Sequence, residues 1–441
     1  MVKSKLSPLP FFILLVVTVL AFFFPFAPKS IVTEGINAAD TAWVLVSAAL
    51  VLIMTPGLAY FYGGMVNTKN VISTMLQSFM AMGIISVVWV VVGFSIAFGD
   101  SVGGFFGNPA SHFLLKGVTD APAWGTIPFL LFAFFQLKFA VITPALVTGS
   151  MAERVNFKAY VVFMVLFSLL IYAPLAHMTW SPGGFFYKMG VLDFAGGTVV
   201  HMSAGWAALA GAIYLKRRRS HANNDFLPPA NVPYVLLGTG LLWFGWFGFN
   251  GGSALAASPL AVIAFATTNT AAGAAGIAWV FFDAIRGKKP SAMGFCIGVV
   301  VGLVAITPAA GFVTVPHALV IGVVAAVISN VIAHLRTKTA LDDTLDVFPC
   351  HGIGGMVGMI LTGVFATATV NEAVTEQGLF FGESSLFLKH LLALVLASIF
   401  SFGMSFVVLK ITDIIIPLRV SQDDENTGLD ISQHDEKLIE A

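Results

Sequence analysis

Two ionisable side chains stand within a stretch of sequence that is otherwise apolar enough to cross a membrane. In "GVLDFAGGTVVHMSAGWAALAGAIYL" (190–215), Asp193 precedes His201 by eight residues. The spacing recurs in "DTLDVFPCHGIGG" (343–355), where Asp343 precedes His351, and both segments read D-x7-H-x3-G. A carboxylate at a helix start caps free N–H groups, and an imidazole donates and accepts protons near neutral pH. The pattern makes the two histidines candidates for an ion or proton pathway.

The alternative interpretation of such a histidine is a packing hydrogen bond between helices, worth on average about 0.6 kcal/mol. Two histidines at equivalent positions of a repeat favour function instead, because an ionisable group within a span costs roughly 2.5–3.5 kcal/mol on insertion. Eight helical residues rise about 12 Å, so His201 and His351 are expected to meet near the middle of a hydrocarbon core about 30 Å thick. Asp346 is an alternative start for the second helix, which would place His351 at a different depth.

The elements that must position these residues are membrane-spanning helices. Of the 441 residues, 58% are hydrophobic and 10% are charged, and the mean hydropathy is +0.91, whereas soluble domains carry about 25% charged residues. The composition predicts an all-α polytopic membrane protein. The eleven predicted transmembrane helices are 42–62, 71–98, 126–149, 157–177, 193–215, 232–253, 259–283, 291–311, 314–335, 347–368 and 386–415.

An earlier apolar stretch, "LPFFILLVVTVLAFFFPFA" (9–27), follows Lys3 and Lys5 and has two interpretations. Residues 1–39 are either a secretory signal peptide, with "INAAD" (36–40) as the best cleavage site, or an additional N-terminal span. The signal peptide is the favoured interpretation. Residues 40–415 then form the membrane domain, and the polar, acidic residues 416–441 form a cytoplasmic regulatory tail.

The basic residues predict the orientation, because cytoplasmic loops carry the excess of Lys and Arg. With the chain near Asp40 outside, the outer loops hold Lys116, Lys188 and Lys389. The inner loops hold Lys69, Arg154, Lys158, Lys216, Arg217, Arg218, Arg219, Arg286, Lys288, Lys289, Arg336, Lys338 and Arg419. We therefore expect a multi-pass protein of the plasma (inner) membrane, with the N-terminus of the mature chain outside and the C-terminus in the cytoplasm.

The two D-x7-H segments belong to a longer internal repeat. Earlier in each half stand "FYGG" (61–64) and "FNGG" (249–252), so the first span corresponds to the sixth and the fifth to the tenth. An odd number of spans per repeat forces the halves, about 40–215 and 232–368, to insert upside down relative to one another. The span 386–415 follows them. Such an inverted 5+5 repeat is typical of transporters, whose site lies at the repeat interface near the membrane midplane.

From Asp40 to the tail, the sequence resembles the ammonium transporter family (Amt/MEP, related to Rh proteins), and in particular its bacterial Amt-type members. The motifs that carry the resemblance are "PGLAYFYGG" (56–64), "FFQLKFAVITPALVTGSMAERVNF" (134–157), "AHMTW" (176–180), "GWFGFNGGSA" (245–254), "ITPAAGF" (306–312) and "DVFPCHGIGG" (346–355). The resemblance implies a transporter and not an enzyme, with no cofactor and no metal.

The resemblance also implies a role for each matching position. Trp180, Phe139 and Ser253 are expected to form the outer ammonium recruitment site, and Phe135, one turn before Phe139, to line the same vestibule. Phe139 and Phe249 are expected to stack as the gate below that site. Asp193 is expected to support the site from beneath. His201 and His351 are expected to be the hydrogen-bonded twin histidines of the pore.

Further expectations come from the family alone: ammonium or ammonia as substrate with methylammonium as a second candidate, a lipid bilayer around the chain, a homotrimer, and a PII-type regulatory protein at the cytoplasmic tail. The zero net charge gives no sign of a nucleic-acid partner. Cys296 and Cys350 are expected to be packing residues. Lys138, beside Phe139, has no assigned role, and snorkelling or pairing at a helix interface is expected for it.

The chemistry of the predicted pore explains why two histidines are useful. A narrow apolar pore excludes both potassium and ammonium, because desolvating either ion is expensive. Ammonium alone can shed a proton and cross as NH3, and paired imidazoles can relay that proton. The hypothesis is separate passage of NH3 and H+. The alternatives are an ammonium sensor or transceptor, an Rh-like channel for neutral NH3 or CO2, and an intramembrane metal enzyme, for which neither HExxH nor GxSxG is found.

Overall fold

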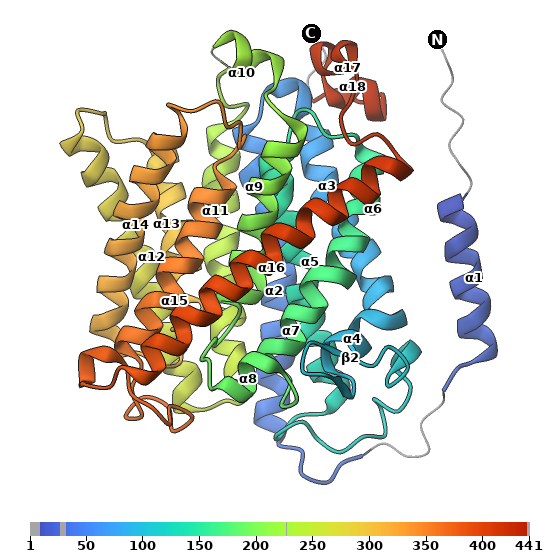
Figure 1. Ribbon diagram of the computed structural model, residues 1–441, viewed down its shortest axis with the longest axis vertical. Helices are drawn as coiled ribbons and strands as arrows, with labels where there is room; N and C mark the ends of the chain where they lie inside the picture. The colour runs from blue at the N-terminus through green and yellow to red at the C-terminus, as the bar shows by residue number, and fades with distance from the viewer. Residues whose placement is uncertain (1–8, 27–31, 226, 439–441) are drawn as a thin grey trace.

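The computed structural model describes residues 9–26, 32–225 and 227–438 of the chain. In this part, ten helices are long and apolar enough to cross a membrane, and two shorter apolar helices, Pro10–Phe23 and Ala292–Ile306, accompany them. The short helices α17 (Gln422–Thr427) and α18 (Leu429–His434) lie at the end of the bundle drawn at the top of Figure 1, called the tail end below. The opposite end carries the strands β1 (Ser101–Val102) and β2 (Phe106–Gly107) and is called the hairpin end.

Each of the eleven predicted spans corresponds to a helical segment. Those of the first half are α2 (Ala38–Met65), α3–η2–α4 (Val71–Val88, Trp89–Gly93, Phe94–Phe98), α5 (Phe129–Met151), α6–η4–α7 (Phe157–Phe167, Ser168–Tyr172, Ala173–Trp180) and η5–α9 (Gly197–Met202, Ser203–Leu215). Those of the second half are α11–η6–η7 (Val232–Trp246, Phe247–Gly251, Gly252–Ala254), α12 (Pro259–Ile285), α13 (Ala292–Ile306), α14 (Val315–Arg336) and η8–α15 (Phe348–Ile353, Gly354–Phe365). The last span, α16 (Ser385–Ile415), runs diagonally across the bundle (Figure 1).

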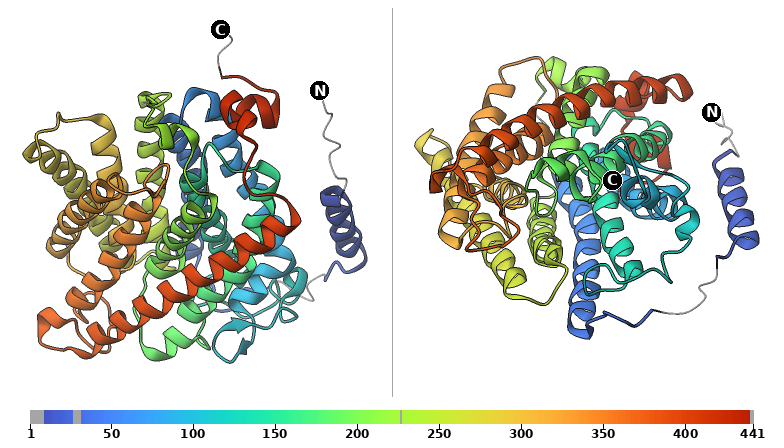
Figure 2. Two further views of the ribbon diagram at one scale, coloured as in Figure 1. Left: turned by 45° about the horizontal axis from the view of Figure 1, so that its top comes forward. Right: turned by 60° about the horizontal axis from the view of Figure 1, so that its bottom comes forward.

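Short elements join the spans. They are η1 (Thr68–Asn70), η3 (Phe113–Leu115), α8 (Phe185–Met189), α10 (Arg219–Asn223) and η9 (Leu379–Phe381). The N-terminal helix α1 (Leu9–Phe23) stands apart from the bundle in every view of Figures 1 and 2, and nearly all of its described side chains are exposed. The segment "INAAD" (36–40) spans the start of α2, with Asn37 as the N-cap and its last three residues within the helix.

Large apolar side chains cover the outside of the bundle as well as its core. On α12, for example, Val262, Phe281 and Ile285 are 67%, 65% and 81% exposed. A helix that is hydrophobic all round is stable only when apolar surroundings cover its outer face. The exposed apolar surface is what a lipid bilayer requires, so the structure is that of a multi-pass membrane protein.

The two halves touch where the repeat predicts that equivalent spans should meet. α2 and α11 lie so close that a Cβ added to Gly238 would come within 2.4 Å of the backbone nitrogen of Phe61. The segments that carry the two histidines cross in the same way, since a Cβ on Gly205 would lie 2.2 Å from the backbone nitrogen of Gly352. Glycine is needed at both crossings because any side chain would push the helices apart. These two contacts place the histidines at the interface between the repeats.

Most spans begin or end within a few residues of the predicted bounds, and at three of them the boundary has a clear local reason. The fifth helix begins at Gly197 and not at residue 193, since Gly196 has a φ of +115° that a helix cannot include. The tenth begins at Phe348, close to the alternative start at Asp346, whose carbonyl accepts the N–H of Cys350 at 3.1 Å and whose φ of +55° keeps the helix from reaching back to Asp343. The eighth stops at Ile306 and not at 311, ahead of Pro308, which has no N–H to continue the helix.

Candidate functional site

An aromatic cavity of about 140 Å³ opens at the hairpin end of the bundle. The rings of Trp180 and Phe139 meet edge to face, with centroids 6.0 Å apart and planes at 78°. Phe135 packs one turn away on α5, 5.0 Å from Phe139. Ser253 Oγ donates to the carbonyl oxygen of Phe249 at 2.8 Å, so its lone pairs stay available to accept a hydrogen bond. Aromatic faces and a hydroxyl acceptor together suit a small cation that carries N–H groups. The lining residues are Trp124, Phe132, Phe135, Gln136, Phe139, Trp180, Phe194, Ser253 and Leu255.

Two closely packed, tilted phenylalanine rings lie between this cavity and the histidines. The rings of Phe139 and Phe249 lie 4.2 Å apart at 38° and are 1% and 0% exposed. Phe139 comes from α5 of the first half, and Phe249 comes from the π-helical segment η6 of the second. Beyond them, Phe249 packs 6.1 Å from the imidazole of His201. The stack therefore separates the cavity from the histidines.

Asp193 lies behind Trp180, a residue that lines the cavity, and fixes the start of η5. Its carboxylate accepts from the backbone nitrogens of Gly196, Gly197 and Thr198 at 2.7–2.8 Å and from Thr198 Oγ1 at 2.5 Å. Its carbonyl oxygen accepts the indole N–H of Trp180 at 3.0 Å. The residue is 7% exposed. A carboxylate at a helix start is stabilised by the free N–H groups there. Asp193 thus holds the His201 helix through its carboxylate and the Trp180 ring through its backbone carbonyl.

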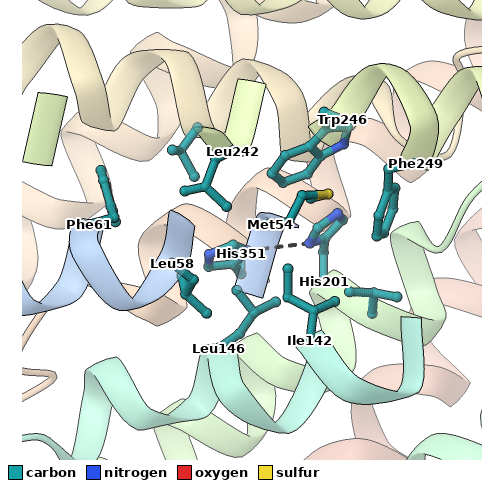
Figure 3. A pocket seen from close by; sticks show the side chains of 12 residues that line it. Met54, Leu58, Phe61, Ile142, Leu146, His201, Leu242, Trp246, Phe249 and His351 are labelled. Atoms are coloured by element: carbon teal, nitrogen blue, oxygen red, sulfur yellow. Dashed lines mark hydrogen bonds between the residues drawn. The ribbon is translucent and has the colours of Figure 1, made fainter. Parts of the chain in front are cut away.

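His201 and His351 lie side by side, as Figure 3 shows. Their Nδ1 atoms are 3.3 Å apart and share a hydrogen bond, and their rings are 5.4 Å apart at 24°. They are 1% and 3% exposed. Both stand in π-helical turns, η5 and η8, in which the local widening of a helix re-aims side chains. Nε2 of His201 has no partner among the described residues.

The space around the two rings is narrow and otherwise apolar. It measures about 10 Å³, which is close to the room that one water-sized molecule occupies. The side chains that surround the histidines are hydrocarbon, aromatic or thioether groups (Figure 3). They are Met54, Leu58, Phe61, Ile142, Leu146, Val200, Leu242, Trp246, Phe249 and Val300. A bare cation finds no ligands here apart from the imidazoles, so its desolvation is uncompensated. This space is called the pore cavity below.

Every predicted site residue lines the aromatic cavity or the pore cavity, except Asp193, which bonds to Trp180 at the edge of the first. Sequence reasoning missed Trp246, whose indole stacks on His201 at 5.4 Å and 17° and whose Nε1 donates to Thr307 Oγ1 at 2.9 Å. The signal that could have found it is its place three residues before Phe249 in "GWFGFNGG". It also missed Trp124 in the aromatic cavity, where "APAWG" (121–125) carries no chemical pattern.

Lys138 is half-buried and does not line the aromatic cavity. It lies one helical turn from Phe134, which is 38% exposed, whereas the neighbouring Phe135 and Phe139 face the cavity. A lysine on this outer face of α5 lies away from the aromatic cavity and the pore cavity.

Cys296 and Cys350 are buried free cysteines. Among the described residues, no group of three or more His, Cys, Asp and Glu side chains is placed to hold a metal ion.

An inverted repeat of apolar helices, with a pair of titratable side chains at the repeat interface, defines a membrane transport protein. A model of the Ammonium Transporter Family matches residues 42–438, and the chain belongs to this family. It is 46% identical to an ammonium transporter of Bacillus subtilis over 91% of this chain and 98% of that protein. It is 43% identical to one of Aquifex aeolicus over 95% and 97%. The crystal structure of Saccharomyces cerevisiae Mep2 superposes with a TM-score of 0.83 at 34% identity, covering 88% of this chain and 89% of that one.

Proposed function

We propose that the chain transports ammonium by binding NH4+ in the aromatic cavity, removing its proton, and passing NH3 and H+ separately along the pore. The observation that carries this proposal is the hydrogen-bonded pair of His201 and His351 in a pore cavity of about 10 Å³ that is otherwise apolar. Among the described residues that line this cavity, the two imidazoles are the only groups that could bind an ion, which supports a proton relay here.

The aromatic cavity has the chemistry to select the cation. A desolvated cation over aromatic faces gains about 2 kcal/mol, and Trp180 and Phe139 supply two such faces. Ser253 Oγ accepts one N–H of the bound ion. Asp193 is hydrogen-bonded to Trp180 through its backbone carbonyl, which brings its carboxylate close to the cavity. A negative charge there favours a cation over neutral NH3.

Passage of the substrate beyond the aromatic cavity depends on whether it can lose a proton. The stacked rings of Phe139 and Phe249 must move apart to admit the substrate, which loses its hydration on entry. NH3 then crosses the pore cavity as a neutral molecule, and the imidazole pair carries the shed proton by exchanging N–H and lone pair between the two Nδ1 atoms. Potassium has no proton to lose, so it is excluded. Net transfer of NH3 with H+ moves one positive charge for each ammonium.

We further propose the plasma membrane as the location, with the hairpin end outside and the tail end in the cytoplasm. The excess of Lys and Arg near the tail end supports this orientation. A homotrimer agrees with the exposed apolar surface described above, and the ordered helices α17 and α18 offer a surface for a PII-type protein. Methylammonium, with one methyl group more, is a second candidate substrate. We propose no catalytic activity for the chain.

Charge movement on a solid-supported membrane tests the proposal, with the full chain in liposomes given equal pulses of ammonium and potassium. We expect a sustained current with ammonium alone. His201→Ala and His351→Ala should each lower it by about tenfold or more, or let potassium pass. His317→Ala is the control, because His317 stacks on Phe365 at 4.5 Å and lines neither cavity; its current should stay within about twofold.

The outcomes separate the candidate functions. Ammonium binding without any current in the native chain would favour a sensor or a neutral-gas channel over the proposed transporter. A native current that survives unchanged and selective in both histidine variants would leave transport intact and overturn the relay.

A further inference from the structure

Asp343 and Asp193 hold equivalent places in the two repeats but are bonded differently. Asp193 accepts four hydrogen bonds at the start of η5. Asp343 accepts one, from the backbone N–H of Phe348 to Oδ2 at 2.7 Å, and its Oδ1 has no partner among the described residues. Asp343 is 0% exposed. A buried carboxylate oxygen without a donor from the described residues is poorly stabilised as an anion, so this site readily holds a proton.

The two neighbouring aspartates have the counter-ions that Asp343 lacks. Asp342 pairs with Arg218 at 2.8 Å, and Asp346 pairs with Arg336 at 2.6 Å. No ion pair to Asp343 occurs in the part of the chain that the structure describes. The segment therefore keeps one unpaired carboxyl between two that are locked as ion pairs.

The segment of Asp343 lies against the inner wall of the pore. The hydroxyl of Tyr62 donates to the carbonyl of Leu146, a residue that lines the pore cavity together with His351. Leu345, two residues after Asp343, donates its N–H to the carbonyl of Gly149, three residues further along α5, at 3.1 Å. The Tyr62 ring crosses the same glycine, where an added Cβ would lie 2.7 Å from Cζ.

A second cavity begins on the other side of this segment. It measures about 190 Å³ and lies at the tail end, with Thr344 and Leu345 in its wall. Met65 also lines it, one helical turn after Phe61, which lines the pore cavity. Asp343 is thus placed between the pore cavity and a larger, polar-lined cavity at the tail end.

Charged and titratable groups face Asp343 from each element packed around it. They are Tyr62 on α2, Arg154 after α5, Arg336 at the end of α14, and Asp346 and Cys350 in its own segment. Burial raises the pKa of Asp343, and the hydrogen bond from Phe348 and the charge of Arg336 oppose that rise without cancelling it. The group therefore exchanges its proton at a pH closer to neutrality than an exposed aspartate does.

We infer that Asp343 is the group that takes the proton from the histidine pair and releases it at the tail end. The inference rests on the proposed separate passage of NH3 and H+. The N–H bond of the protonated His351 breaks, and solvent water carries the proton to Asp343, where an O–H bond forms on Oδ1. That bond then breaks to protonate water in the tail-end cavity, and the carboxylate is restored. The proton is the only species transferred, and no electrons change hands.

The test compares Asp343→Asn with the native chain in proteoliposomes. Asparagine has the same size, and its oxygen still accepts the N–H of Phe348, but its amide cannot release a proton. We expect the ammonium current to fall about tenfold or more and to lose its dependence on pH at the tail-end side. The binding of ammonium at the aromatic cavity, measured by calorimetry, should not change. Asp343→Glu, which keeps a carboxyl, should recover part of the current.

Asp346→Asn is the matched control, because it removes a carboxylate from the same segment and asparagine tolerates the positive φ of +55° found there. Its current should stay within about twofold of native. The inference would be overturned if the native chain gave a current and Asp343→Asn gave a current of the same size and the same pH dependence. The proposed function would then remain intact. Equal losses in Asp343→Asn and Asp346→Asn would also overturn it, since they would indicate a general electrostatic or structural effect. The absence of any native current would instead refute the proposed function on which the inference rests.

Discussion

The indole of Trp246 lies nearly parallel to the imidazole of His201, with ring centroids 5.4 Å apart and planes at 17°. The indole is itself held by its Nε1 hydrogen bond to Thr307 Oγ1 at 2.9 Å, and Thr307 comes from the end of α13. The Nδ1 atom of His201 meets His351 at 3.3 Å, so a small rotation of the ring would break their contact. The orientation of the proposed relay therefore depends on Thr307, a residue that does not line the pore cavity.

Thr307→Val is expected to disturb this arrangement without changing the size of the side chain. The substitution leaves the buried Nε1 of Trp246 without an acceptor, at a cost of about 1–3 kcal/mol. We expect a lower ammonium current with little change in half-saturating concentration, because the aromatic cavity is untouched. Electrophysiology on a solid-supported membrane measures both. Thr412→Val is the control, since Thr412 is buried and bonds only within α16; an equal loss in both variants would argue against a positioning role.

Trp180→Leu is expected to weaken the entry of the cation. The substitution removes one aromatic face and the hydrogen bond to the carbonyl of Asp193. A cation–π contact is worth about 0.5–2 kcal/mol, so the half-saturating ammonium concentration should rise between about twofold and thirtyfold. Trp180→Phe keeps an aromatic face but not the indole N–H, so its half-saturating concentration should lie between those of the native chain and Trp180→Leu. Concentration series of the transport current provide the measurement, and an unchanged half-saturation in the leucine variant would contradict the assigned role.

The sequence alone predicted the meeting of His201 and His351. Their equivalence follows from the D-x7-H-x3-G spacing and from the odd number of spans in each half, and both are properties that a sequence displays directly. The eleven spans were predictable for the same reason, since hydropathy and length determine them. The roles of Trp180, Phe139 and Ser253 rest on the family resemblance and remain predictions.

Other features depend on contacts that no spacing reveals. Asp193 and Asp343 look equivalent in the sequence, yet Asp193 caps η5 with four hydrogen bonds because Gly196 lets the chain turn into this helix three residues later, whereas Asp343 accepts one bond, from Phe348 at the start of η8. Asp346 delays the second helix until Phe348 and leaves Asp343 with a single hydrogen bond. The docking of the tail on α3 joins residues more than 350 positions apart, and no periodicity records such a contact.

Acid is expected to destabilise the tail end through Asp342. Burial opposes the ionisation of this carboxyl, but the hydrogen bonds and charge of Arg218 outweigh burial and lower its pKa to about 2. Because the pKa in the unfolded chain is about 3.9, the ionised carboxylate stabilises the fold fully above about pH 4, and that stability is lost as the pH falls toward 2. The contribution is about 2–3 kcal/mol at neutral pH.

Thermal unfolding, followed by tryptophan fluorescence from pH 7 downward, measures this effect. Asp342→Asn should lower the Tm at neutral pH and show a smaller further drop on acidification than the native chain. Asp423→Asn serves as the control, since Asp423 is exposed on α17. Parallel acid curves for the native chain and Asp342→Asn would show that the ion pair does not stabilise the fold.

The last prediction concerns Asp430, which caps α3 from the tail. Its Oδ1 accepts the N–H of Ser73 at 2.8 Å and its Oδ2 that of Ile72 at 3.1 Å, while Leu429 donates its N–H to Asn70 at 2.8 Å. Removing a cap costs about 1 kcal/mol, and up to about 2. Asp430→Ala should therefore increase the population of the undocked tail by about tenfold.

Hydrogen exchange detects this change at two places at once. Exchange should quicken in the peptide that covers α18 and also in the peptide that covers the start of α3, because the two segments share the same hydrogen bonds. Asp435→Asn is the control, since Asp435 lies exposed five residues further along and asparagine tolerates its positive φ of +58°. Faster exchange in α18 alone would mean that water replaces Asp430 at α3 without loss, so the tail would be bound to the bundle through Lys69 and Arg419 instead.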